Sequence, residues 1–317
     1  MKAIVQNGYG TTEHVSVKEV ERPRIDDGQV LVNVRASSVN AGDLFTVKGS
    51  PYMIRFSAGF PKPKDFILGW DVAGVVEEVG AGVDDLQAGG EVFGSCESAF
   101  AEVVAIKRRA LARKPAGLTF EAAAAVPTAA LTALQQLRDS GGLQEGERVL
   151  VLGAAGGVGS FAVQLAKYFG ASVTGLCRTD KVDFVRSIGA DHVIDYTAED
   201  FTRSQERYDL VLDNIGRVPF SRMKRVLTPT GRLVPNSGHG GMSHVISGML
   251  HGMFSKKVTG MKIASLNRDD LDLLAGLIQK GDITPIIDQV FPFEETARAI
   301  DRLDGGDVKG KVVVAVS

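Results

Sequence analysis

Cysteine is scarce in this chain: Cys96 and Cys177 are the two among 317 residues. Two cysteines cannot form the several disulfides of a small secreted scaffold. They also cannot form the four-cysteine site of a structural zinc lobe. The opening Met1-Lys-Ala-Ile-Val is soon followed by polar residues, so we expect no secretory leader. These features together predict a cytoplasmic protein.

An excess of one charge is also absent. The chain has 36 Lys and Arg against 38 Asp and Glu, so its net charge of −2 creates no strong field for nucleic acid or an anionic membrane. The one basic run, at residues 107–109 and 113–114, has no interleaved aromatic residues for stacking on bases. Residues 149–166 carry no charge and are long enough to resemble a membrane span, but four glycines interrupt them. We therefore expect neither a nucleic-acid partner nor a membrane partner.

Those glycines form the most informative motif of the chain. A β-branched and aliphatic run at 149–152 enters a glycine-rich turn, and a helical pattern follows. The turn matches the G-x-G-x-x-G fingerprint of dinucleotide-binding folds with its first glycine replaced by Ala154. Gly156 would let the backbone approach a pyrophosphate, and Gly159 would let the helix pack closely on the strand. The predicted cofactor-binding turn comprises Ala154, Ala155, Gly156, Gly157, Val158 and Gly159.

The pattern of elements divides the chain into two domains. Short β-branched runs dominate the first third, at 3–5, 15–20, 30–36, 72–79 and 100–104. An Ala- and Leu-rich helical stretch at 119–137, interrupted at Pro127, marks the boundary. Strands then alternate with helices, which predicts a doubly wound parallel sheet with strands at 149–152, 172–176, 192–194, 210–213, 232–235 and 257–261 and helices at 157–169, 181–188 and 220–227.

The tail returns to the β-rich domain. It contains helical patterns at 269–279 and 294–303 and a last strand at 312–316, too few elements for a domain of their own. The predicted domains are therefore 1–120 with 264–317, and 121–263. Residues 236–256, rich in Gly, Met, Ser and His, are either a loop beside the substrate or an oligomer contact. Their histidines match no standard ligand spacing, so we expect no metal site.

The end of the second Rossmann strand indicates the cofactor. An acidic residue there would bind the adenosine ribose of NAD, whereas basic residues would bind the 2′-phosphate of NADP. The sequence places Cys177 at the strand tip, and Arg178, Thr179 and Lys181 together could hold a phosphate. Asp180 is a conflicting signal, although its position also suits a helix N-cap. We expect NADPH.

Several longer motifs stand in a characteristic order: Met1-Lys-Ala-Ile-Val, the segments 36–43, 68–76 and 154–159, Gly189-Ala-Asp-His-Val-Ile-Asp-Tyr196 and Gly310-Lys-Val-Val-Val314. In these motifs the chain resembles the medium-chain dehydrogenase/reductase superfamily, in its zinc-free quinone oxidoreductase (zeta-crystallin-like) branch. The resemblance covers nearly the whole chain and implies an α/β protein, with a GroES-like β-rich catalytic domain and a Rossmann domain, that forms a homodimer.

The departures from zinc-dependent members of that superfamily indicate the chemistry. Those enzymes have a zinc-ligating cysteine where this chain has Asn40, and Gly-His-Glu where it has Gly69-Trp70-Asp71. Without a Lewis acid, an unactivated ketone lacks the ion that stabilises an alkoxide. A quinone or an α,β-unsaturated carbonyl is already electrophilic and needs only positioning and hydrogen-bond donors. We expect NADPH-dependent reduction of such substrates, with a 2-enoyl thioester reductase or a non-catalytic NADPH-binding protein as alternatives.

The resemblance also implies roles for single residues. It places Asn40 near the nicotinamide, Thr128 near the phosphates or ribose, Lys181 and Tyr196 around the 2′-phosphate, and Asn214 and Ser237 along the cofactor. As alternatives, Asn40 and Asn214 could be turn residues and Tyr196 a packing residue.

The proton source stays open. Some relatives carry a tyrosine where this chain has Phe45, and Tyr52 could substitute by donating a proton or orienting a carbonyl oxygen. Water is the other candidate. Trp70 either lines the cleft or packs in the core. Asp43 more plausibly braces a loop than performs acid–base work. The predicted catalytic residues are Asn40, Tyr52 and Trp70.

Overall fold

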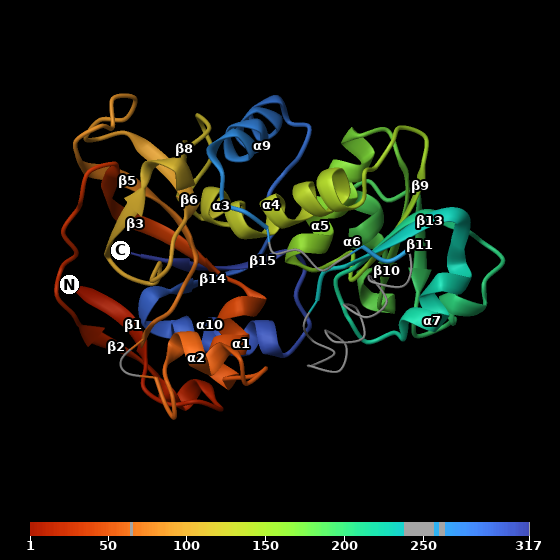
Figure 1. Ribbon diagram of the computed structural model, residues 1–317, viewed down its shortest axis with the longest axis horizontal. Coiled ribbons are helices and arrows are strands. Elements are labelled where there is room, and N and C mark those ends of the chain that lie inside the picture. The colour runs from red at the N-terminus through yellow and green to blue at the C-terminus, as the bar shows by residue number, and fades with distance from the viewer. Residues whose placement is uncertain (64–65, 238–256, 260–263, 317) are drawn as a thin grey trace. The chain divides into compact units, whose positions relative to one another are not determined.

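The computed structural model describes residues 1–63, 66–237, 257–259 and 264–316, and it divides the chain into two compact units (Figure 1). The first unit comprises Met1–Leu131, Ser265–Gly281 and Pro285–Ser317, and the second comprises Thr132–Ala264 and Asp282–Thr284. The tail segments 265–281 and 285–317 therefore belong to the first unit. The predicted loop at 236–256 lies outside the described residues from 238 onward, and so do its three histidines.

The first unit is built on two β-sheets. The larger has the order β14-β15-β3-β5-β6-β8, with β7 also paired to β3, and the smaller has the order β2-β1-β4. The predicted runs near residues 3, 15, 30 and 72 are strands, whereas the run at 100–104 becomes a strand only from Val103. The strands are β1 (Lys2–Gln6), β2 (Val15–Glu19), β3 (Gln29–Val39), β4 (Phe66–Ile67), β5 (Asp71–Val79), β6 (Glu91–Ser95), β7 (Val103–Lys107), β8 (Leu111–Arg113), β14 (Ile287–Pro292) and β15 (Lys311–Ala315).

Helices pack on several strands of these sheets. Pro127 starts a helix because it lacks the N–H that the first helical turn leaves unpaired, which explains the predicted interruption there. The helix before it packs on β3 and β5, so 121–131 belong to the first unit rather than to the second. The helices are α1 (Ala41–Lys48), α2 (Ile54–Ala58), α3 (Phe120–Ala124), α4 (Pro127–Gln135, continued by a π-helical turn, Gln136–Ser140), α9 (Arg268–Lys280) and α10 (Thr296–Asp304).

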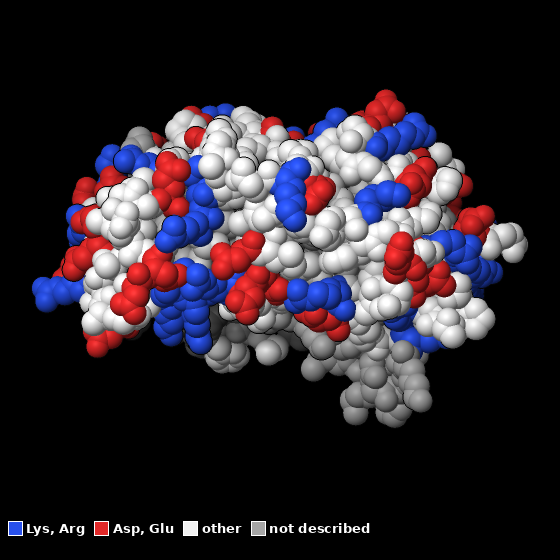
Figure 2. Space-filling model, turned by 90° about the horizontal axis from the view of Figure 1, so that it is seen from above, with Lys and Arg blue, Asp and Glu red and all other residues white. Residues whose placement is uncertain are grey.

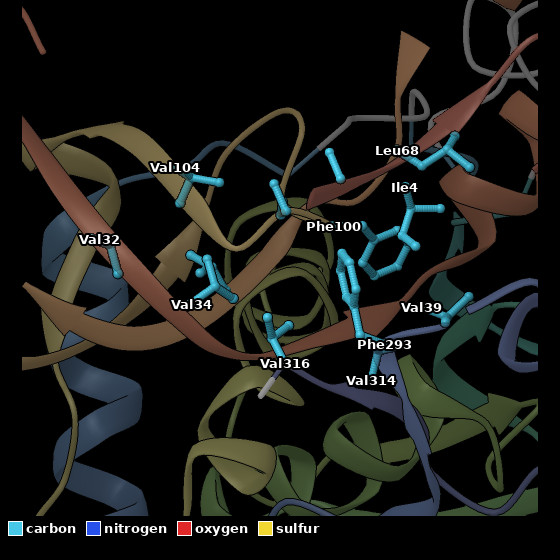
Figure 3. Packing of buried hydrophobic residues seen from close by; sticks show 14 of the residues in the cluster. Ile4, Val32, Val34, Val39, Leu68, Phe100, Val104, Phe293, Val314 and Val316 are labelled. Atoms are coloured by element: carbon cyan, nitrogen blue, oxygen red, sulfur yellow. The ribbon is translucent and has the colours of Figure 1, made fainter. Parts of the chain in front are cut away.

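The core of the first unit joins segments from both ends of the chain. Ile4, Leu68 and Phe100 from the first third gather with Phe293 and Val314 from the tail (Figure 3). All five side chains are at most 4% exposed. Burial of this apolar surface holds the tail on the N-terminal sheets, which explains why the tail forms no domain of its own.

The second unit contains the predicted Rossmann sheet. All its strands are parallel, in the order β11-β10-β9-β12-β13, so β10 and β11 are added on one side of β9 and the order then reverses, with β12 and β13 on the other side. Ligands of such sheets bind outside the carboxyl ends of the strands at this reversal. The elements are β9 (Arg148–Leu152), α5 (Gly157–Tyr168), β10 (Ser172–Cys177), α6 (Val182–Ser187), β11 (His192–Asp195), β12 (Tyr208–Asp213), α7 (Phe220–Met223) and β13 (Leu227–Pro235).

The sixth strand predicted at 257–261 is not formed as a strand in the described residues. Val258 makes a single isolated parallel bridge with Leu233, and residues 260–263 lie outside the description. The described sheet therefore has five strands.

Charges of both signs are interspersed on the face shown in Figure 2. This agrees with the nearly balanced composition. Within the described residues, no helix is long and apolar enough to cross a membrane.

Candidate active site

The glycine-rich turn has the geometry of a phosphate site. The chain leaves β9 through Gly153, whose φ of +70° favours glycine, and Gly156 is the extended N-cap of α5. The first N–H groups of a helix have no carbonyl partner in a preceding turn, and the helix dipole adds positive potential there. This end of α5 can therefore hold a pyrophosphate.

Gly153 is a residue that the sequence-based assignment missed. The G-x-G-x-x-G spacing expects its first glycine two residues before Gly156, at the position that Ala154 occupies. The positive φ instead falls on the residue directly after the strand. A glycine immediately following a β-branched run is the signal that could have found it.

The two later glycines of the turn have different roles. A Cβ atom on Gly159 would lie 2.0 Å from the carbonyl oxygen of Gly153, so the helix can pack on the turn only without a side chain there. A Cβ atom on Gly156 would lie 3.5 Å from the same oxygen, an ordinary contact. Packing inside the protein therefore requires Gly159 but not Gly156. The bare backbone of Gly156 is available for close approach of a phosphate.

The tip of β10 carries a paired set of charges. Arg178 Nε donates to the Asp180 carboxylate at 2.6 Å, and this contact lowers the pKa of Asp180 to about 2. The Thr179 hydroxyl donates to the Asp195 carboxylate at 2.6 Å, whereas Lys181 is buried. Burial raises the pKa of the Cys177 thiol to about 11. Arg178 and Thr179, two of the predicted phosphate-binding residues, thus each contact a carboxylate.

The carboxyl ends of the neighbouring strands are joined by amide side chains. Asn214 Nδ2 donates to the Leu152 carbonyl at 3.1 Å, and Asn236 Nδ2 donates to Asn214 Oδ1 at 2.7 Å. The Ser237 hydroxyl donates to the carbonyl of Ile215 at 3.2 Å. These contacts link β9, β12 and β13 at the sheet edge where a Rossmann ligand binds. Tyr196, just beyond β11, is 49% exposed.

The first unit contains a buried polar cluster around Asp71, the first residue of β5. Asp71 Oδ1 accepts from the backbone N–H of Thr128 at 2.8 Å and from its hydroxyl at 2.5 Å. Asp71 Oδ2 accepts from the Ser38 hydroxyl at 2.7 Å and from Asn40 Nδ2 at 2.9 Å. Asp71 is fully buried. The sequence marked Asp71 only as a departure from a zinc motif, and the structure makes it the centre of the cluster.

Two more charged side chains join this cluster. Lys311, at the start of β15, donates to Asn40 Oδ1 and lies 3.4 Å from Asp71 Oδ2. Asp43 accepts from the backbone N–H of Asn40 at 2.8 Å and from that of Gly69 at 3.0 Å. Asp43 therefore braces the start of α1, as expected. Burial is the largest cause that raises the pKa of Asp43 to about 7, and Asp71 raises it further.

The structure places the predicted catalytic residues in different surroundings. Asn40 lies inside the buried cluster with Thr128. Trp70 is partly exposed beside it, and its carbonyl accepts from the N–H of Cys96 at 2.8 Å. Tyr52 is 71% exposed, and the Arg55 guanidinium lies 4.5 Å from the centre of its ring. The cluster does not include Tyr52.

Comparisons with known proteins identify the class. The family model of the alcohol dehydrogenase GroES-like domain matches residues 26–162, and that of a zinc-binding dehydrogenase matches residues 188–314. The chain is 33% identical to the NADPH-dependent alkenal/one oxidoreductase of Arabidopsis thaliana chloroplasts, and the match covers 99% of this chain and 79% of that protein. A 2-methylene-furan-3-one reductase of Solanum lycopersicum matches with the same identity and coverage.

Solved structures of quinone oxidoreductases match the fold of the whole chain. The quinone oxidoreductase of Escherichia coli in complex with NADPH superposes with a TM-score of 0.86 at 26% identity, over 100% of both chains. The quinone oxidoreductase of Coxiella burnetii gives 0.88 at 27% identity, over 100% of this chain and 99% of the other. The protein is thus an oxidoreductase with a GroES-like unit and a Rossmann unit. It belongs to the medium-chain dehydrogenase/reductase superfamily, among its quinone and alkenal oxidoreductases. Its cofactor is a reduced nicotinamide dinucleotide.

Proposed function

We propose that this protein uses NADPH to reduce quinones or α,β-unsaturated carbonyl compounds, without zinc. The names of its relatives support the reaction class, since they include alkenal/one and quinone oxidoreductases. The observation that carries the proposal is the position of Lys311. Its ammonium group lies against Asn40 and Asp71, the chain's counterparts of two positions in the zinc motifs.

The described donor set does not fit zinc. Asn40 offers an amide oxygen that already accepts from an ammonium group, and a divalent cation beside that group would be repelled. Zinc prefers thiolate, imidazole and carboxylate ligands. Burial and then Asp71 raise the pKa of the nearby Cys96 thiol to about 12. Among the described residues, no group of three or more His, Cys, Asp or Glu side chains could hold a metal ion.

The residues of the chain bind and orient the cofactor and the substrate. When bound, the reduced nicotinamide supplies the hydride. The N-terminus of α5 binds the pyrophosphate, and Asn214 and Ser237 lie at the carboxyl edge of the sheet where the cofactor extends. Addition of hydride to an enone or a quinone spreads negative charge over an enolate or a phenolate, which needs hydrogen-bond donors rather than a Lewis acid. The proton then comes from Tyr52 or from water.

A panel of electron acceptors tests this function. With NADPH, we expect the nicotinamide absorbance to fall in the presence of a small enone or a quinone and to stay constant with the corresponding saturated ketone. The reason is that only the first two substrates delocalise the added charge. Consumption of NADPH with the saturated ketone at an equal rate would contradict the proposal, and so would the absence of turnover with every enone and quinone tested.

The preference for NADPH depends on Arg178. Its side chain is 44% exposed, so a 2′-phosphate can reach the guanidinium and accept charge-assisted hydrogen bonds. Arg178→Ala should raise the KM for NADPH about tenfold and leave that for NADH nearly unchanged. Arg138→Ala is the matched control, since Arg138 forms a similarly exposed pair with Asp139 in the same unit. Equal effects of Arg178→Ala on both cofactors would contradict this assignment.

A further inference from the structure

Lys311 is an ammonium group enclosed by acceptors. Its Nζ atom donates to the Val39 carbonyl at 3.1 Å and to Asn40 Oδ1, and it lies 3.4 Å from Asp71 Oδ2. The side chain is 4% exposed. An ammonium group has three protons, and these three acceptors use all of them. Lys311 therefore cannot donate to a substrate and can act on one only through its neighbours.

The nearest of these neighbours is the Asn40 amide, whose orientation is fully determined. Its Nδ2 donates to Asp71 Oδ2 at 2.9 Å and to the Ser38 carbonyl at 3.2 Å. Its Oδ1 accepts from Lys311. Lys311 is thus the contact that fixes the oxygen end of this amide.

Charge balance gives Lys311 a second role. Two fully buried carboxylates, Asp71 and Asp43, face this one ammonium group. The Lys311 charge lowers the pKa of Asp43, whereas burial and Asp71 raise it, and the net value is about 7. Asp71 also acts on the Cys96 thiol, whose pKa is raised to about 12 by burial, Asp71 and Glu97. Removal of the ammonium charge would thus favour the protonated form of Asp43 near neutral pH.

Asp43 holds the backbone of Asn40, as Lys311 holds its side chain. Its carboxylate accepts from the backbone N–H groups of Asn40 and Gly69, and it binds both more strongly when it is charged. Gly69 is followed by Trp70, so this carboxylate connects the start of α1 with the segment that enters β5. The side chain and the backbone of Asn40 therefore both depend on Lys311, the first directly and the second through Asp43.

We propose that Lys311 is a positioning residue for hydride transfer: its buried ammonium group orients the Asn40 amide. This inference rests on the proposed function of the site. It assigns a role to a residue 271 positions away from Asn40 in the sequence, without any contact between Lys311 and the substrate.

The test compares Lys311→Met, which keeps the stem and removes the charge, with Lys311→Arg, which restores charge and donors. For Lys311→Met at a temperature where it stays folded, we expect kcat with an enone at pH 7 to fall about tenfold or more, while the KM for NADPH changes less than about threefold. The acid limb of the kcat profile should move to higher pH, because Asp43 then takes up its proton more readily. Lys311→Arg should recover part of kcat.

Lys48→Met is the matched control, since Lys48 forms an exposed ion pair with Asp304 in the same unit. It should change neither kcat nor the pH profile. If Lys311→Met only lowers the melting temperature and leaves kcat and the acid limb unchanged, the role is structural and the proposal is wrong. A loss of NADPH affinity equal to the loss of kcat would also overturn it.

A second measurement does not depend on turnover and so separates this inference from the proposed function. The carboxyl carbon of Asp43 can be titrated by NMR in the wild type and in Lys311→Met. We expect a midpoint near 7 in the wild type and a higher midpoint in the variant. Equal midpoints would overturn the inference even if the wild type reduces enones.

Discussion

Gly159→Ala is expected to abolish NADPH binding and to destabilise the second unit by about 3 kcal/mol. The added Cβ atom would lie 2.0 Å from the Gly153 carbonyl oxygen and 2.8 Å from its carbonyl carbon. Both are backbone atoms of the phosphate turn, so relief of the contact must move either the turn or α5. Thermal unfolding and equilibrium NADPH titration measure the two effects.

Gly156→Ala separates the effect of this turn on stability from its effect on NADPH binding. A Cβ atom there meets only an ordinary contact of 3.5 Å, so the melting temperature should change little. Affinity for NADPH should nevertheless fall, because the new methyl group occupies the space where a pyrophosphate approaches the backbone. Gly276→Ala in α9, where a Cβ atom has nothing within 4 Å, should be neutral or stabilising.

Normal NADPH affinity in Gly159→Ala would refute the assignment of the turn at 153–159 as the pyrophosphate site.

The second large effect is expected for Asp71→Asn, which should lower the free energy of unfolding by about 3–5 kcal/mol. The substitution removes the negative charge beside the buried Lys311 ammonium group. Asp71 accepts hydrogen bonds from Thr128, Ser38 and Asn40, and the substitution replaces one of its two accepting oxygens with a donating NH2 group. A buried charge without its partner is costly, because neither water nor a counterion replaces it. Denaturant unfolding of both proteins measures the difference.

Asp304→Asn provides the comparison for Asp71→Asn. Asp304 pairs with Lys48 at 2.5 Å in the same unit, but both side chains are more than 40% exposed. Exposed pairs of this kind contribute about 1 kcal/mol or less. If both substitutions cost the same, the Asp71 cluster is not the buried network described above.

The Rossmann unit was predictable from the sequence because its signals are local. The strand at β9, the glycine turn and the start of α5 lie within about a dozen consecutive residues, and the turn chemistry is encoded in glycines. The strands at 91–95, 111–113 and 287–292 were missed because they are short and have weak alternation. The strand predicted from residue 257 onward rested on β-branched residues such as Val258, but Val258 makes one isolated bridge rather than part of a strand.

The polar cluster of the first unit could not be predicted in the same way. Its contacts join Asp71 to Thr128, 57 residues away, and to Lys311, 240 residues away. Periodicity and motif spacing carry no information about such pairs. The sequence identified Asn40 and Gly69-Trp70-Asp71 as departures from zinc motifs, but it could not show that an ammonium group from the last strand contacts both Asn40 and Asp71. A lysine flanked by a glycine and β-branched residues, Gly310-Lys311-Val312, was the available hint of a buried charge.

The central claim is hydride transfer from NADPH to an activated alkene without a metal ion. The direct test is a single-turnover reaction of chelator-treated, zinc-assayed protein with NADPH deuterated on the nicotinamide ring and an α,β-unsaturated ketone. The account predicts deuterium on the β-carbon of the product, formed at the same rate as by untreated protein. Loss of the reaction on chelation and its recovery with zinc would contradict the account.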